Sequence, residues 1–209
     1  MTISEWYLNA TTFPIFNQTT TNYIASLQPF VADHWKNTSA EMRAFKKNLL
    51  EQLIKLQDNR CAYCGLGLSR SLVDREHFVS KGKPENKPEF MFHPRNLFAA
   101  CAFCNRILKG RKKSIATFDA DYDKCTFKII HPYFDVAPTE IKFIKNRRGL
   151  HVVAQAITPK GEATIKFFEL DKADITAKRA GYIAEKQELE NISADTLANI
   201  KSISCYRPT

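Results

Sequence analysis

Apolar residues recur at steps of three and four along the segment that follows residue 38. The apolar positions are Met42, Phe45, Leu49, Leu53 and Leu56. Such spacing places side chains on one face of an α-helix, and the stripe is typical of core packing. Thr38, followed three residues later by Glu41, matches a capping box, so the helix is predicted to begin there. It is predicted to end near Asp58 and Asn59.

The flanking patterns predict further helices and strands. Residues 1–37 hold scattered aromatic side chains, with a helix predicted over about 20–35. Residues 115–135 are predicted to be irregular or extended. Beyond them, IKFIK, LHVVAQAI and ATIKFFEL are separated by the turn sequences NRRG and TPKGE. This alternation predicts a three-stranded antiparallel meander.

The C-terminal part returns to helical spacing. A helix is predicted over 172–189, although Arg179 interrupts its apolar face, and a last short helix is predicted over 193–203. The apolar positions of the longer helix are Ile175, Tyr182, Ile183 and Leu189. The chain has 209 residues, of which 44% are hydrophobic, so it is long enough to build one sizeable core.

Charge and cysteine content indicate which partners, which compartment and which cysteine chemistry to expect for this chain. The net charge is +9, which favours a polyanionic partner. The first residues lack a basic start followed by an apolar run, and no stretch approaches the roughly 20 apolar residues that span a bilayer. We therefore expect a cytoplasmic protein without a membrane segment. In a reducing compartment, paired cysteines indicate metal binding or redox chemistry more often than disulfides.

Two Cys-x-x-Cys pairs stand 36 residues apart. Cys61 and Cys64 form the first pair, and Cys101 and Cys104 form the second. Such pairs wrap tightly around Zn²⁺, and four thiolates leave no open coordination position, so the spacing predicts a structural zinc site. A disulfide or a thioredoxin-like redox site is the weaker alternative, because the latter needs one such pair beside a βαβ pattern. The two other cysteines are predicted to be small core residues; they are Cys125 and Cys205.

The segment between the cysteine pairs holds polar residues suited to chemistry. Glu76 and His77 lie in a stretch that suits a strand, and Asn96 precedes LFAAC, a second predicted strand. Asn105 follows the last cysteine and begins a predicted helix, where an asparagine is often only a cap. A lone histidine is more often structural than catalytic. His93 is predicted to be an ordinary loop residue, with a metal or phosphate contact as the alternative.

The pattern CxxC…EHF…NL(x)₃CxxCN(x)₃KG resembles the HNH endonuclease family, in which a ββα-metal unit is often braced by zinc knuckles. The resemblance implies that His77 is the general base and that Glu76 and Asn105 hold a catalytic Mg²⁺ or Mn²⁺. It implies that Asn96 orders the loop and orients His77. The chain departs from the family by having Glu where Asp is commoner, Asn as the final motif residue and a long loop with KGKPENKPEF, a candidate substrate-contacting turn.

The predicted fold is therefore α+β, with a ββα-metal core braced by the four cysteines. An N-terminal helical region (1–58), this nuclease core (59–114) and the β meander with C-terminal helices (115–209) are predicted to share one compact unit. Residues 61–113 hold 11 Lys and Arg against 4 Asp and Glu, which is +7 of the total charge. The residues predicted to hold DNA phosphates are Arg106, Lys109, Arg111, Lys112 and Lys113. A solvated basic face is the alternative.

The whole arrangement is also similar, more loosely, to the HNH nuclease subunit of Septu-type bacterial antiphage systems, which implies an ATPase partner. Two other hypotheses compete with a DNA endonuclease. One is a non-catalytic zinc module that binds nucleic acid, which leaves Glu76, His77 and both asparagines unexplained. The other is a protein-interaction adaptor, which a salt-sensitive affinity for nucleic acid would contradict.

Overall fold

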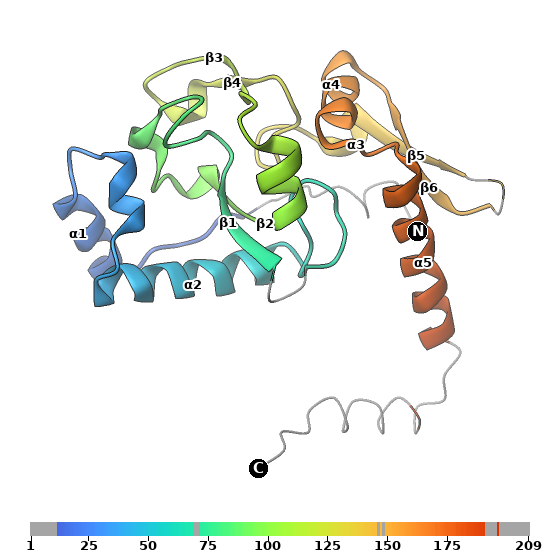
Figure 1. Cartoon of the computed structure of the whole chain (residues 1–209), viewed down its shortest axis with the longest axis horizontal. Coiled ribbons are helices and arrows are strands. Elements are labelled where there is room, and N and C mark those ends of the chain that lie inside the picture. The colour runs from blue at the N-terminus through green and yellow to red at the C-terminus, as the bar shows by residue number, and fades with distance from the viewer. Residues whose placement is uncertain (1–11, 69–71, 146, 148, 191–195, 197–209) are drawn as a thin grey trace.

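The computed structural model describes residues 12–68, 72–145, 147, 149–190 and 196 (Figure 1). Its fold is α+β, with helices around three small antiparallel sheets. The predicted helix after residue 38 is confirmed as α2 (Ala40–Leu56). Its N-cap is Ser39, whose side chain accepts a hydrogen bond from the Met42 amide, so the cap lies one residue after the predicted Thr38. Four of the five stripe residues are buried, and Leu56 is half-buried.

The single helix predicted over 20–35 is wrong. The structure has α1 (Gln18–Ser26) and a 3₁₀ helix (Ala32–Lys36), separated by a non-helical segment that contains Pro29. Proline lacks an amide donor and restricts the residue before it, so it ends the helix. The break lets Trp35 pack edge-on against Phe45, at a ring-centroid distance of 6.0 Å.

The segment between the cysteine pairs contains two strands that pair with each other as a hairpin with a long loop. β1 (Val73–His77) pairs with β2 (Leu97–Cys101) in antiparallel register, with Glu76 opposite Phe98. A loop with two short 3₁₀ turns, Pro88–Phe90 and Pro94–Asn96, joins them. A π-helix (Phe103–Lys109) follows β2. The two predicted strands are thus present, and the helix predicted to start at Asn105 begins two residues earlier and ends at Lys109, before Gly110.

The chain after residue 114 contains two more sheets. β3 (Ile115–Thr117) pairs with β4 (Thr126–Phe127), around a 3₁₀ turn at Tyr122–Lys124. After α3 (Ala137–Glu140), β5 (Ile141–Lys145) pairs with β6 (His151–Ala156), so the first two strands of the predicted meander are confirmed.

The third predicted strand is a helix instead, α4 (Pro159–Phe168). Thr158 caps it by accepting a hydrogen bond from the Gly161 amide, and Pro159 fits the first helical position. A β-carbon on Gly161 would lie 1.9 Å from the Glu140 carbonyl oxygen, so only glycine allows the end of α3 to pack here. The sequence TPKGE is therefore a helix start and not a hairpin turn.

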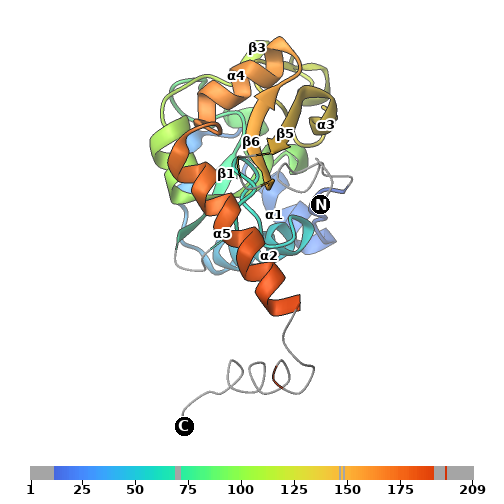
Figure 2. The same ribbon diagram turned by 90° about the vertical axis from the view of Figure 1, so that its right-hand side faces the viewer.

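The predicted helix over 172–189 is confirmed as α5 (Ala173–Glu190). Arg179, which interrupts its apolar face, is fully buried and donates hydrogen bonds to the carbonyl oxygens of Val152 and Leu170. Its guanidinium also lies 4.9 Å from the Phe143 ring centre. The first turns of α5 pack on β6, and its last turns project beyond the rest of the described chain (Figures 1 and 2).

One hydrophobic core joins all three predicted regions. It includes Leu53 of α2, Phe98 of β2 and Phe168 of α4. Apart from Thr196, which is helical, the helix predicted over 193–203 lies outside the described residues, as does Cys205. Among the residues that the structure describes, no helix has both the length and the apolar character that crossing a membrane requires.

Candidate metal centre and cleft

The four paired cysteines meet at one point. Their sulfur atoms all lie within 4.8 Å of one another, so the cluster can bind a metal ion such as zinc. The first pair sits in a tight turn in which the Gly65 amide donates to the Cys61 carbonyl oxygen and Gly65 has a φ of 72°. Cys101 ends β2, and Cys104 belongs to the π-helix. The cluster therefore joins the turn, the hairpin and the helix.

The donor set fits a structural zinc ion. Four sulfur ligands complete a tetrahedral site and leave no position for water or substrate. The Cys101 amide donates to the Cys61 sulfur at 3.3 Å, which favours a thiolate at that atom. None of the five described cysteines is in a disulfide, and Cys125 is a buried core residue as predicted.

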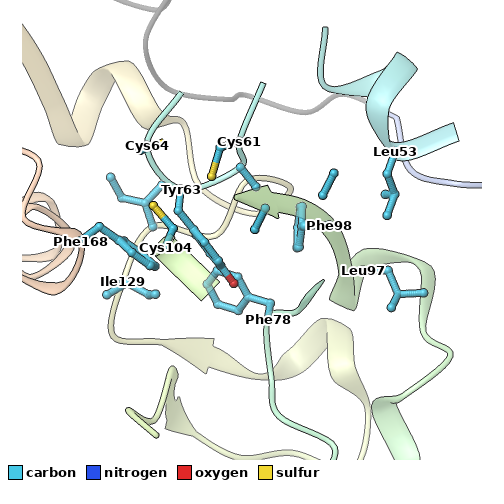
Figure 3. Packing of buried hydrophobic residues seen from close by; sticks show 14 of the residues in the cluster. Leu53, Cys61, Tyr63, Cys64, Phe78, Leu97, Phe98, Cys104, Ile129 and Phe168 are labelled. Atoms are coloured by element: carbon cyan, nitrogen blue, oxygen red, sulfur yellow. The ribbon is translucent and has the colours of Figure 1, made fainter. Parts of the chain in front are cut away.

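Tyr63, between the first two cysteines, links the metal centre to Glu76. Its ring stacks on Phe168 of α4, with centroids 4.2 Å apart (Figure 3). Its hydroxyl donates a hydrogen bond of 3.0 Å to the Glu76 carboxylate. The position of Glu76 therefore depends on the fold of the cysteine turn, a connection that the sequence pattern did not indicate.

Glu76 also forms an ion pair with Lys109, at the end of the π-helix. The Lys109 ammonium donates a second hydrogen bond, of 2.6 Å, to the carbonyl oxygen of His77. Both charged side chains are buried. Lys109 was predicted to hold DNA phosphate; in the structure its ammonium is directed inward and pairs with the Glu76 carboxylate.

His77 is buried beside Trp35 and Lys81. The Trp35 and His77 ring centroids are 4.3 Å apart with an edge-on angle of 80°, and Lys81 Nζ lies 3.4 Å from His77 Nδ1. Burial lowers the pKa of His77 well below its usual 6.5, and the charges of Lys81 and Lys109 lower it further, while the backbone of Met91 partly opposes this. The imidazole is therefore neutral at pH 7.

Asn105 lies in the helix and is not its cap, because the π-helix begins at Phe103. Its amide nitrogen donates to Asp74 on β1 at 3.0 Å. Arg106 also pairs with Asp74, at 2.6 Å, and this guanidinium is the main cause of the lowered pKa of Asp74. Two of the predicted functional residues are thus tied to the hairpin, although the Arg106 side chain remains largely exposed.

A cleft of about 400 Å³ brings together three of the four predicted catalytic residues. Glu76, His77 and Asn105 line it. Four lysines and one further acid also line it: Lys36, Lys81, Lys83, Lys109 and Asp33. The excess of positive charge favours an anionic ligand. A larger hollow of about 610 Å³ between α1 and α2 has no histidine or cysteine in its walls, so size alone does not identify the site.

Asn96 is not among the residues that line the cleft. It is fully buried, donates to the carbonyl oxygens of Val79 and Phe90, and accepts from the Val79 amide and the Tyr122 hydroxyl. All the hydrogen-bonding atoms of its side chain are thus engaged. Because Val79 lies between His77 and Ser80, which both line the cleft, Asn96 fixes the backbone of this part of the cleft wall.

One of its own side chains, Glu85, holds the predicted substrate-contacting turn KGKPENKPEF in place through hydrogen bonds. The Glu85 carboxylate accepts hydrogen bonds from the amides of Ser80, Ser114 and Ile115 and from the Ser114 hydroxyl. Within this turn, Lys81, Gly82 and Lys83 line the cleft. The turn therefore contributes two positive charges to it.

The remaining basic residues of the predicted phosphate-binding run are exposed. Arg111, Lys112 and Lys113 follow the helix, and Lys112 donates to the Phe167 carbonyl oxygen at 3.1 Å. His93, predicted to be an ordinary loop residue, lies 3.7 Å from the Asp123 carboxylate and does not line the cleft. None of these four residues is among those that form the cleft wall.

A divalent ion at Glu76 does not fit this arrangement of side chains. Among the described residues, only the cysteine cluster groups three or more histidine, cysteine or acidic ligands. The Oε1 atom of Glu76 already accepts hydrogen bonds from both Lys109 and Tyr63. The expected Mg²⁺ or Mn²⁺ held by Glu76 and Asn105 would require Lys109 to move.

His131 anchors the network behind Asn96, and sequence reasoning gave it no role. Its Nε2 lies 2.9 Å from the Tyr122 hydroxyl, and its Nδ1 accepts from the Tyr133 amide. One ring nitrogen thus accepts, so the ring is neutral. Burial lowers the pKa of His131 well below 6.5, with smaller effects of Lys160, His93 and Arg95.

The buried His131 predicts an acid-sensitive fold. The unfolded chain, with a histidine pKa near 6.5, binds a proton more readily than the folded chain, so stability is complete above about pH 6.5 and falls as pH drops below it. One such group contributes a slope of about 1.4 kcal/mol per pH unit. Urea unfolding of the zinc-loaded protein between pH 5 and 8 measures it. In His131→Gln the slope is expected to fall by that amount; an unchanged slope would contradict the assignment.

No family model matches this chain. Searches of curated proteins and of solved structures likewise returned no match.

Proposed function

We propose that the protein is an endonuclease that hydrolyses DNA phosphodiester bonds. One observation carries the proposal: a neutral imidazole and several lysines line the same cleft, and its walls include residues of the β1 strand and of the π-helix that carries Cys104. Hydrolysis needs a base that accepts a proton from water and positive charge that stabilises the phosphate as its negative charge grows. His77 is suited to the first task, and Lys36, Lys81 and Lys83 are suited to the second.

Each residue has a definite task in this proposal. His77 accepts the proton of the attacking water, and Trp35 holds its ring from the side. Lys81, which is half-buried, presents its ammonium next to that ring. The zinc ion that the cysteines would hold is structural, because four thiolates leave it no open position. Its contribution is to position the turn from which Tyr63 contacts Glu76.

Incubation of the zinc-loaded protein with supercoiled plasmid tests the proposal. Nicked or linear DNA is the expected product, and its absence under all divalent-metal conditions would contradict the proposal. A second candidate is a zinc-dependent module that binds nucleic acid without cutting it. The buried Glu76–Lys109 ion pair favours this candidate, because it leaves the carboxylate closed to a metal ion. Salt-sensitive binding without cleavage would support it.

The lysines of the cleft predict a specific loss of DNA affinity. Lys36 and Lys83 line the cleft with exposed side chains, and each phosphate contact contributes about −0.9 to the slope of log affinity against log salt. The double variant Lys36→Gln and Lys83→Gln is expected to bind duplex DNA more weakly and with a slope smaller by about 2. Fluorescence anisotropy at several salt concentrations measures both effects.

Two exposed lysines on the same protein provide the matched control. Lys47→Gln with Lys55→Gln removes the same charge from α2, and neither residue lines the cleft. This control is expected to keep more of the wild-type slope than the cleft variant. Equal losses in both double variants would show that only net charge matters and that DNA does not enter the cleft.

The resemblance to Septu-type nucleases extends the proposal to an antiphage effector controlled by an ATPase subunit. Exposed apolar side chains on the π-helix support a protein partner, since Phe103 is 54% exposed and Ile107 is 67% exposed. Both residues lie on the helix that carries Lys109, so a partner bound there would contact the element that lines the cleft.

A further inference from the structure

A short turn in the cleft wall, the 80–83 turn, carries backbone donors that the protein itself does not use. Its residues are Ser80, Lys81, Gly82 and Lys83, and all four line the cleft. In the described part of the chain, the amides of Lys81, Gly82 and Lys83 donate to no protein acceptor. Successive unused amides of a turn can form a concave site for an anion. The turn is therefore a candidate binding site within the cleft.

The other backbone groups of the 80–83 turn hold it in shape. The Ser80 amide donates to the Glu85 carboxylate at 2.7 Å. The Ser80 carbonyl oxygen accepts from the Lys87 amide at 3.0 Å, and the Gly82 carbonyl oxygen accepts from the Asn86 amide at 2.8 Å. These bonds order the turn while its three free amides stay available. A site that is already ordered loses less conformational entropy when a ligand binds.

The ion pairs of the cleft leave two of its positive charges without a carboxylate partner. The cleft walls hold four lysines and two acids, a net charge of +2. Lys36 pairs with Asp33 at 2.8 Å, and Lys109 pairs with Glu76. The two lysines of the 80–83 turn form no ion pair with any described carboxylate. The uncompensated charge of the cleft therefore belongs to the same turn that carries the free amides.

Lys81 is held in place beside two rings of the site. Its Nζ lies 3.4 Å from His77 Nδ1 and 5.4 Å from the centre of the Trp35 ring. An ammonium has three N–H donors, so a contact with the imidazole leaves donors for a ligand. The Glu76 carboxylate, in contrast, is closed by Lys109 and Tyr63. The cleft thus offers ammonium and amide donors to an anion and no open carboxylate to a metal ion.

We propose that the 80–83 turn binds a doubly charged phosphate group through its two lysines and its free amides, without a divalent cation. This rests on the proposed function and deepens it, because it identifies the part of the cleft that holds the phosphate. A DNA diester carries one negative charge, and the reacting group gains a second as the attacking water gives a proton to His77. A net charge of +2 therefore complements the reacting group better than the unreacted diester.

Titration of the zinc-loaded protein with inorganic phosphate tests this site. Calorimetry at about pH 8, where phosphate is mostly doubly charged, is expected to show one phosphate per chain. The affinity is expected to be the same with and without added Mg²⁺. The double variant Lys81→Met with Lys83→Met is expected to bind at least about tenfold more weakly, because it loses two charged donors. No saturable binding, binding that requires Mg²⁺, or wild-type affinity in the double variant would overturn the proposal.

Two further variants control for net charge and for folding. Lys47→Met with Lys55→Met removes the same charge from α2, outside the cleft, and is expected to bind phosphate like wild type. An equal loss in this control would reduce the effect to net charge and overturn the site. Lys83 is exposed, so Lys83→Met alone covers the case in which loss of the half-buried Lys81 prevents folding. It is expected to bind phosphate more weakly, and wild-type affinity in it would overturn the proposal.

Two comparisons separate the amides from the charge of the ligand. Gly82→Pro removes one amide donor, whereas Gly82→Ala keeps it and places a β-carbon 3.9 Å from that of Ala32, an ordinary contact. The proline variant is expected to bind phosphate more weakly than the alanine variant, and equal affinities would exclude the amides. Dimethyl phosphate, which carries one charge, is expected to bind wild type more weakly than phosphate does. Equal affinities for the two ligands would contradict a site for a doubly charged group.

Failure of this site and failure of the nuclease proposal give different results, because phosphate titration requires no cleavage. Phosphate binding by a protein that does not nick plasmid would reject the nuclease alone. Nicking by a protein whose 80–83 turn binds no phosphate would reject the phosphate site alone.

Discussion

Replacement of His77 by alanine is expected to abolish plasmid nicking while the zinc content stays at one ion per chain. General-base catalysis contributes about 10²- to 10⁴-fold, so any remaining activity should fall by at least that factor. His77 is the one histidine among the residues that line the cleft, and its lowered pKa keeps it neutral at pH 7. The rate of nicked-circle formation on agarose gels measures the effect.

His93→Ala is the matched control for this loss. His93 is also partly buried, but it lies against Asp123 and outside the cleft wall, so this variant should retain activity. His77→Ala also removes a ring that packs on Trp35, and His77→Gln separates packing from chemistry because it fills more of the space. Wild-type nicking by His77→Gln would exclude His77 as the base.

Substitution of Cys101 by serine is expected to remove the metal and most of the stability of the fold. A structural zinc ion contributes an apparent binding free energy of about 10–16 kcal/mol in small zinc domains, and loss of one thiolate removes much of it. Cys101 ends β2 and its sulfur accepts from the Cys104 amide, so the hairpin and the π-helix should separate together. Metal analysis and thermal unfolding measure the outcome.

Cys125→Ser is the control, because Cys125 is a buried cysteine outside the cluster. It should keep a full zinc complement and lose only the stability of a core substitution. Unchanged zinc stoichiometry in Cys101→Ser would refute the four-cysteine site. Loss of zinc should also release Tyr63 and with it the hydrogen bond that Tyr63 donates to Glu76.

Several elements could be read from the chain because their determinants are local. The 3.6-residue spacing of α2 and the polar cap before it are properties of consecutive residues, and the structure confirms this helix. Alternating patterns around NRRG predicted β5 and β6 correctly. The spacing of the cysteine pairs predicted their cluster, because each pair forms its own turn and the metal requirement then joins the two.

Other elements could not be predicted from neighbouring residues alone, because the same short stretch contained residues that favour a helix and residues that favour a strand or a break. ATIKFFEL has strand-forming residues, yet Thr158 and Pro159 begin a helix whose buried face packs on β6. Likewise, the helix predicted over 20–35 contained no clear stop other than Pro29, and only the structure shows how Trp35 then reaches His77.

The sequence by itself determined that four cysteines can gather around one ion, that a strand carries Glu76 and His77 and that a helix carries Asn105. Only the tertiary structure decided which charge meets Glu76. In the sequence, Lys109 is one basic residue in a basic run. Its ammonium is directed into the protein because a π turn positions the residue and a carboxylate 33 residues earlier pairs with it. The pattern of a sequence records spacing along the chain, whereas the partner of a buried charge is selected by distant segments that pack together and exclude water.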